Sequence, residues 1–148
     1  MGSSTAAGTT IGMSAALPAA QTTAGYEALT FILIGGVEKL GTIGASTNKI
    51  EFQPLAGPKE KHKGSTDYGS LQPSLAHDPE DAGQTLLRTA GEPDNNARYA
   101  YCVTYASGDK RYFQGRVFGY PENVDGADSI LMANPTIEID TKIIKDDA

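Results

Sequence analysis

The side chains that could act as metal ligands or catalytic groups are few and far apart. The chain has two histidines, His62 and His77, and a single cysteine, Cys102. Two histidines fifteen residues apart and one distant cysteine lack the spacing of a zinc site. A serine–histidine–carboxylate triad would need a nucleophile-elbow sequence, and none occurs. We therefore predict no catalytic residue, no metal site and no enzymatic activity, with His62 solvated and His77 forming a local hydrogen bond.

Aromatic residues in the second half of the chain offer another kind of chemistry, the stacking of nucleic-acid bases. The same residues could pack across two adjacent strands without any ligand. The net charge of −6 disfavours contact with phosphates, so cross-strand packing is the favoured interpretation. The glycines show no phosphate-loop spacing, and we predict no cofactor. The aromatic residues concerned are Tyr99, Tyr101, Tyr105, Tyr112 and Phe113.

The sharpest charge feature is a basic run inside a long polar loop predicted for residues 56–66. A run of charges usually marks a solvated surface. Loops of this length, however, are uncommon unless they are functional or disordered. We expect this loop to dock on an acidic surface of another copy of the protein. The basic residues are Lys59, Lys61, His62 and Lys63, and the candidate acidic partners are Glu80, Asp81, Glu122, Asp125 and Asp128.

Length and composition indicate one domain rich in turns and strands. The chain has 148 residues, 17 glycines, 8 prolines and no tryptophan, which favours a β protein over a helical bundle. A lone cysteine excludes an intramolecular disulfide and is typical of a protein made in a reducing cytosol. The longest apolar run, residues 31–34, is too short to span a membrane. The N-terminus lacks the features of a secretory signal, so we expect no membrane association and a bacterial cytoplasmic origin.

Residues 67–91, DYGSLQPSLAHDPEDAGQTLLRTAG, predict a strand followed at once by a short helix. Pro73 marks the strand over residues 68–76 as an edge or bulged strand. Asp78 is expected to cap the helix, with Pro79 at its first position and Glu80 and Asp81 facing the positive end of the helix dipole. Gly91 is expected to end the helix in a left-handed cap. The block contains no catalytic group, so its role is architectural.

Other segments alternate between polar and apolar residues, as half-buried strands do. Residues 99–105 and 110–120 predict a hairpin turning at residues 107–109, with Tyr99, Tyr101, Val103 and Tyr105 on one face. Further strands are predicted over residues 30–34, 37–43, 49–55 and 129–144. Together these elements predict an α+β, mainly β domain, a β-sandwich or half-barrel with one short helix packed on it.

Residues 1–25 consist almost entirely of Gly, Ala, Ser and Thr and carry no charge. Such a segment buries too little apolar surface to offset its ordering entropy, so alone it should be disordered. Two interpretations stay open, a flexible tail or an arm that orders against a neighbouring subunit. We divide the chain into a flexible N-terminal arm, residues 1–25, and a folded domain, residues 26–148.

The order and spacing of these pieces resemble the major tail tube protein of long-tailed bacteriophages with non-contractile tails. The resemblance rests on the pattern DYGSL…LA.DP.DAGQ..LR.A in residues 67–90, on KIEFQPL and the basic run before it, and on YFQG and PTIEID after it. It covers residues 28–144. The N-terminal segment is longer than the family core requires.

The resemblance implies six-subunit rings whose inner sheets join into a barrel and which stack into a hollow tube. It also implies a virion protein, assembled in the host cytoplasm, with the tape measure, tail terminator and distal tail proteins as partners. Genome DNA would pass through the bore without specific binding, because acidic groups there would repel it. Glu138 and Asp140 are candidate bore residues, although loop acids would serve equally and the strand acids could instead keep an outer face soluble. Two alternatives remain, a tail terminator of related fold and a small ligand-binding β-sandwich that uses the tyrosine-rich hairpin as its platform.

Overall fold

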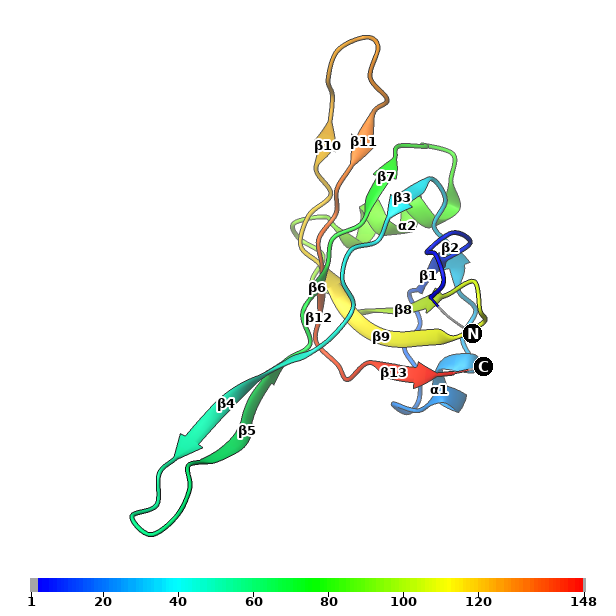
Figure 1. The fold of residues 1–148 in the computed structure, drawn as a ribbon. Helices are drawn as coiled ribbons and strands as arrows, with labels where there is room; N and C mark the ends of the chain where they lie inside the picture. Colours follow the sequence, from blue (N-terminus) through cyan, green and yellow to red (C-terminus); the bar gives the residue numbers. More distant parts are fainter. Residues whose placement is uncertain (1–2, 148) are drawn as a thin grey trace.

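A computed structural model describes residues 3–147 and shows a mainly β protein from which two hairpins project (Figure 1). All strand pairs are antiparallel. The main sheet has the order β2 (Ile32–Leu33), β1 (Thr10–Ser14), β8 (Tyr99–Thr104), β9 (Lys110–Val117), β12 (Ile137–Ile139), β6 (Ser70–Leu71), and β13 (Ile144–Asp146) pairs with β9. The smaller sheet has the order β10 (Glu122–Asn123), β11 (Met132–Ala133), β7 (Ser74–Ala76), β3 (Val37–Lys39). A separate two-stranded ribbon consists of β4 (Ser46–Phe52) and β5 (Glu60–Asp67).

The predicted hairpin of β8 and β9 forms the centre of the main sheet, and its two faces enter two different clusters. Tyr101 and Val103 join the larger hydrophobic core, while Cys102 and Tyr112 join a smaller cluster on the opposite face. The alternation predicted from the sequence is therefore confirmed. Tyr101 lies opposite Phe113 with the rings stacked at a centroid distance of 5.4 Å. Cross-strand packing, not base stacking, is what these buried rings do.

Two helices cover the two faces of the main sheet. Helix α2 (Ala82–Ala90) buries Leu87 and Ala90 in the larger core. Helix α1 (Thr23–Glu27) buries Tyr26, which stacks on Tyr112 at 5.1 Å. One helix was predicted; α1 was missed because a five-residue helix has too few turns to show a period. Within the described residues, neither helix has the length and apolar character needed to cross a membrane.

The start of α2 lies three residues later than predicted. Its N-cap is Asp81, whose carboxylate accepts a hydrogen bond from the Gln84 amide, and residues 78–81 form a turn in which Asp78 accepts from the Glu80 amide. The predicted end at Gly91 is confirmed, but its φ of −83° is right-handed, so the predicted left-handed cap is wrong. A Cβ at this position would lie 3.3 Å from both Gly119 and Tyr120, so a larger residue would need these neighbours to shift slightly.

The N-terminal segment also differs from the prediction of a flexible arm over residues 1–25. Thr10–Ser14 forms β1, which pairs with β2 on one side and β8 on the other. Ile11 and Met13 are fully buried, and Gly12 gives room to Phe31, whose Cβ would lie 3.0 Å from a Cβ at that glycine. The average composition of residues 1–25 concealed this short pattern. Two apolar residues around one glycine are enough to hold a strand in place when both of its edges are paired. Residues 1–2 lie outside the described part of the chain.

Two other predicted segments divide. The strand over residues 68–76 splits at Pro73 into β6 of the main sheet and β7 of the smaller sheet, so the proline marks the point where the chain changes sheets. The strand region over residues 129–144 divides into β11, β12 and β13. The predicted polar loop over residues 56–66 is wrong in part, since residues 60–66 belong to β5.

Candidate assembly surfaces

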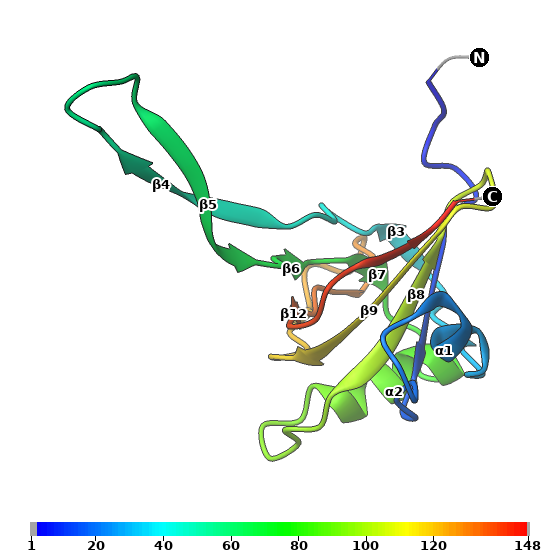
Figure 2. The same ribbon diagram turned by 90° about the horizontal axis from the view of Figure 1, so that it is seen from below.

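The β4–β5 ribbon projects far from the body of the molecule and is solvent-exposed along almost its whole length (Figures 1 and 2). A two-stranded hairpin that packs on nothing is only marginally stable in water. The pairing of β4 with β5 defines the shape of the ribbon. Among the described residues, those outside the ribbon leave almost all of its side chains exposed. The ribbon is therefore a candidate surface for contact with another subunit or protein.

One face of the ribbon is basic. The register places Lys49 opposite Lys63 and Glu51 opposite Lys61, so these four side chains share a face. Glu51 forms ion pairs with Lys49 at 3.1 Å and with Lys59 at 3.3 Å. Within residues 3–147, Lys61 and Lys63 form no ion pair. The face therefore holds three lysines and one carboxylate, and Lys59 of the connecting loop adds a fourth positive charge beside it.

The other face, called the apolar face below, carries two large apolar side chains and one member of the predicted basic run. Ile50 and Phe52 are 54% and 57% exposed, and they lie opposite His62 and Glu60. Gly64 provides the space for Ile50, because a Cβ there would be 3.0 Å from the Ile50 side chain. His62 and Glu60 pair with each other at 3.3 Å. The structure thus separates His62 from the lysines with which the sequence grouped it.

The β10–β11 hairpin projects in a different direction, away from the ribbon (Figure 1). It exposes two aliphatic side chains, Val124 at 80% and Ile130 at 71%. Its three acidic residues, Glu122, Asp125 and Asp128, are exposed as well. The strand β10 is an edge of the smaller sheet, so its outer backbone groups are unpaired. Exposed apolar and acidic side chains thus lie together on this hairpin.

The other acids named from the sequence lie in different surroundings. The Asp81 carboxylate is engaged inside the subunit, where it accepts hydrogen bonds from the amides of Gly35 and Gln84 at 3.0 and 2.9 Å. Glu80 is exposed in the turn before α2. Glu138 is half-buried on β12, opposite Arg116. The structure therefore does not bring these acids together with those of the β10–β11 hairpin.

Asp140 lies between two arginines. Its Oδ2 atom is 2.6 Å from Nη1 of Arg116 and 3.2 Å from Nε of Arg98. Arg116 also donates to the carbonyl of Asn96 at 3.0 Å. Asp140 is therefore ion-paired within the subunit, and Glu138 lies opposite one of the same arginines, Arg116.

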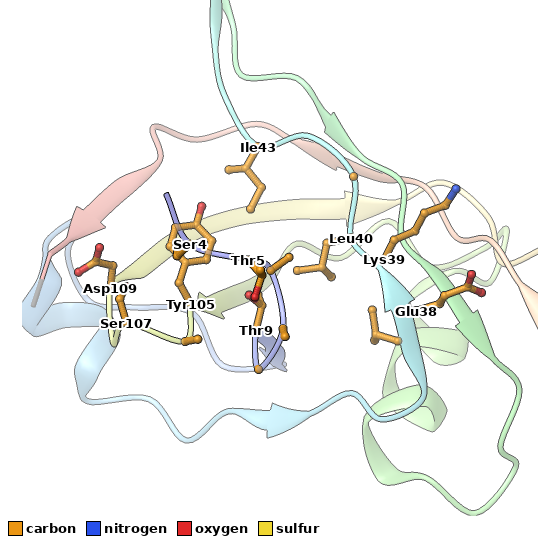
Figure 3. Close-up of a pocket in the computed structure, with 16 residues that line it drawn as sticks. Ser4, Thr5, Thr9, Glu38, Lys39, Leu40, Ile43, Tyr105, Ser107 and Asp109 are labelled. Carbon is orange, nitrogen blue, oxygen red and sulfur yellow. The ribbon is translucent and has the colours of Figure 1, made fainter. Parts of the chain in front are cut away.

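A groove of about 750 Å³ lies beside the N-terminal segment (Figure 3). Val37, Leu40, Ile43 and Tyr105 line it with apolar atoms, and Figure 3 shows Thr5 between Tyr105 and Leu40. Nothing in the sequence pointed to this groove, because its walls come from three distant segments. Across the described residues, no cluster of three or more His, Cys, Asp or Glu side chains could hold a metal ion.

The buried titratable groups are poor candidates for chemistry. Burial raises the pKa of the Cys102 thiol above its ordinary value, which keeps the thiol protonated and unreactive. Burial likewise raises the pKa of Tyr112 to about 12. The His77 amide donates to the Leu131 carbonyl at 2.8 Å, whereas its side-chain Nδ1 is buried without a partner among the described residues. The local side-chain hydrogen bond expected of His77 is not formed at that nitrogen.

The two ends of the main sheet are a further surface. Strand β2 pairs only with β1, so its other edge is open, whereas at β6 the backbone of residues 41–44 lies close to the flanking residues Gly69 and Gln72. On β2, Leu33 is 62% exposed and Ile32 is partly exposed. Open apolar edges invite pairing with another chain. The sequence marked the strand over residues 68–76, which contains β6, as an edge or bulged strand, but gave no such sign for β2.

Three solved structures share this architecture, at sequence identities that establish only the fold. A chain of the baseplate of the anti-feeding prophage (AFP) matches with a TM-score of 0.70 and 6% identity, covering 99% of this chain and 97% of that chain. The SPP1 tail tube matches at 0.62 and 13%, covering 95% and 77%. The sheath/tube terminator of an extracellular contractile injection system (PVC) matches at 0.60 and 13%, covering 77% and 86%. No protein-family model and no curated protein sequence matches the chain.

The chain therefore has a tail-tube-like fold. It is mainly β with antiparallel sheets, as the sequence predicted, and its structural neighbours are components of phage tails and related injection machines.

Proposed function

We propose that this chain is a structural subunit of a phage tail tube. Six copies form a ring, the rings stack, and the resulting hollow tube delivers DNA to the host. The observation that carries the proposal is the fold, which matches the SPP1 tail tube over 95% of this chain and leaves the outer edge of β2 without a partner strand. Such a sheet can continue from one subunit into the next, whereas a closed barrel could not.

Ring formation would join β2 of one subunit to the β6 end of the next. This contact is heterologous, because two different edges meet, and heterologous contacts close into a ring when the rotation between subunits allows it. Pairing would satisfy the free backbone groups of the β2 edge and remove Ile32 and Leu33 from water. The apolar residues on an otherwise open edge thus have a purpose in the assembly.

DNA passage requires a bore that does not hold the DNA. The net charge of −6 per subunit favours repulsion of the phosphate backbone. Glu138 is the strand acid that fits this role better than Asp140, whose charge is offset by two arginines. The tape measure, tail terminator and distal tail proteins would be its partners in the virion, with assembly in the host cytoplasm and no catalytic role. Residues 3–9, which precede β1, would be the part of the predicted arm that is left to contact a neighbour.

Negative-stain electron microscopy of the concentrated purified protein tests the proposal. Long hollow tubes with six-fold symmetry in cross-section are expected. A Leu33→Lys variant should abolish rings and tubes, because it places a charge in the joined edges. The matched control is Leu17→Lys, which changes an exposed leucine outside the sheet and should leave assembly intact. Wild-type protein that stays monomeric at high concentration would disprove the proposal.

The second candidate is a tail terminator, favoured by the likeness to the PVC sheath/tube terminator. A terminator would form one ring and stop. The same micrographs separate the two functions, because lone rings without stacks indicate a terminator. The ligand-binding β-sandwich has less support, since the aromatic residues of its supposed platform are mostly buried.

A further inference from the structure

We propose that the apolar face of the β4–β5 ribbon docks on the β10–β11 hairpin of a second copy of this chain, and that the basic face of the ribbon guides the approach. This contact would join successive rings. The inference rests on the proposed function and makes it specific by naming the two surfaces that meet.

Of the ribbon's two faces, we expect the apolar face to contribute more of the binding free energy. Ile50 and Phe52 lie side by side on it, and Leu55 stands fully exposed in the turn. Interfaces derive most of their binding energy from a few buried apolar or aromatic anchors. Exposed ion pairs contribute little, because water and salt screen them. Three large apolar side chains on a projecting ribbon are therefore a docking surface, and the lysines are its surroundings.

The β10–β11 hairpin complements the ribbon in both respects. It offers exposed Val124 and Ile130 for apolar contact. It also carries three acids and no basic residue between positions 121 and 134, which suits the unpaired Lys61 and Lys63. Lys61 and Lys63 lie on the face opposite Ile50 and Phe52, so they act at longer range, where complementary charges raise the rate of encounter more than they raise affinity. The exposed apolar side chains and the acids thus both favour the β10–β11 hairpin as the partner surface.

The directions of the two projections favour a second copy over contact within one subunit. The ribbon and the hairpin point away from one another (Figure 1), so a single chain cannot bring them together. A contact between two different surfaces that point in opposite directions repeats from copy to copy and builds an open array. Stacked rings are such an array. An alternative occupant of the basic face, nucleic acid, is disfavoured by the acidic character of the whole chain.

The first test removes the apolar face with the double variant Ile50→Ser and Phe52→Ser. Both residues are exposed, so the subunit fold should survive, and circular dichroism checks this. Lone rings without stacks are expected in electron micrographs. Leu17→Ser is the matched control and should stack normally. If the double variant elongates into tubes as the wild type does, the docking inference is refuted while the proposed function stands.

The second test exchanges charges between the two surfaces. The variant Lys61→Glu/Lys63→Glu and the variant Asp125→Lys/Asp128→Lys should each slow elongation about 10-fold at low salt, measured by light scattering. Combining all four substitutions should restore the rate, because the attraction is re-formed with reversed signs. A combined variant no faster than either pair alone would show that the acidic hairpin is not the receiving surface. Binding of a short duplex DNA by the wild type, lost with Lys61→Glu/Lys63→Glu, would also overturn the inference in favour of nucleic acid.

Discussion

Replacing Gln84 by methionine removes a side chain that holds three separate backbone segments together. The Gln84 amide nitrogen donates to the carbonyls of Gly35 and Ala76 at 2.8 and 2.9 Å, and its oxygen accepts from the Asp78 amide at 2.8 Å. Gln84 itself is completely buried. Methionine has a similar volume but can neither donate nor accept these bonds, so the substitution tests the hydrogen bonds with little change in packing.

The magnitude follows from the groups left without a partner. A buried polar group that loses its hydrogen bond costs about 1–3 kcal/mol. The two carbonyls belong to partly buried residues, Gly35 and Ala76, whereas Asp78 is exposed and water can replace its bond. Counting only the carbonyls gives a loss of about 3 kcal/mol in the free energy of unfolding. For a chain of this size, that loss corresponds to a fall in Tm of about 10 °C.

Urea denaturation, followed by far-UV circular dichroism at a concentration where light scattering detects no assembly, measures the loss. Gln53→Met is the matched control, because Gln53 also donates to two backbone carbonyls, those of Pro54 and Gly57, but in an exposed turn. Water should replace those bonds, and the control should lose less than about 0.5 kcal/mol. Equal effects of the two substitutions would refute the view that Gln84 acts through buried hydrogen bonds.

Three other predictions follow from buried positions. Gly83→Ala should destabilise the protein by about 3 kcal/mol or more, because the alanine Cβ would lie 2.1 Å from the Leu33 carbonyl oxygen. Elsewhere in a helix the same substitution is stabilising by about 1 kcal/mol. A variant that is more stable in the same urea assay would contradict this packing. The free energy of unfolding should fall as the pH rises from about 10 to 12. Burial raises the pKa of Tyr112 to about 12 and raises the pKa of Tyr101 as well, so unfolding releases protons from both hydroxyls in this range. Denaturation midpoints that do not change with pH in this range would be evidence against this prediction. The Cys102 thiol should react with a thiol reagent only at the rate of unfolding, and rapid labelling of the native protein would show that the thiol is accessible.

The central hairpin could be predicted from sequence because its alternation has a physical cause that acts locally. Tyr101 and Val103 enter one core and Cys102 the other, so each strand residue is buried according to its parity. The β4–β5 ribbon offers the opposite case. Residues 60–66 were predicted as a loop because both faces of β5 meet solvent, and a strand without a buried face has no apolar period to detect.

The position of the helix start shows a different limit. Asp78-Pro79 has the local chemistry of a cap, and Asp81 was also available three residues later. The choice between them depends on Gly35, which is 46 residues away and donates to the Asp81 carboxylate. A contact of that range is absent from any local pattern. The β2 edge of the main sheet and the groove near Tyr105 were missed for the same reason, since strand order and cavities depend on non-local contacts.

Residues 81–84, DAGQ, carry no reactive chemistry but contact β2, the edge strand that the proposed ring would use, and the residues that follow it. Asp81 binds the Gly35 amide, Gln84 binds the Gly35 carbonyl, and the missing side chain of Gly83 lets the Leu33 backbone lie against α2. These three contacts fix the chain directly after β2. An edge held in its paired conformation loses less conformational entropy when a neighbour joins it. Gln84→Met should therefore raise the protein concentration needed for ring formation even at temperatures where the variant is folded, and an unchanged threshold would confine the role of the segment to stability.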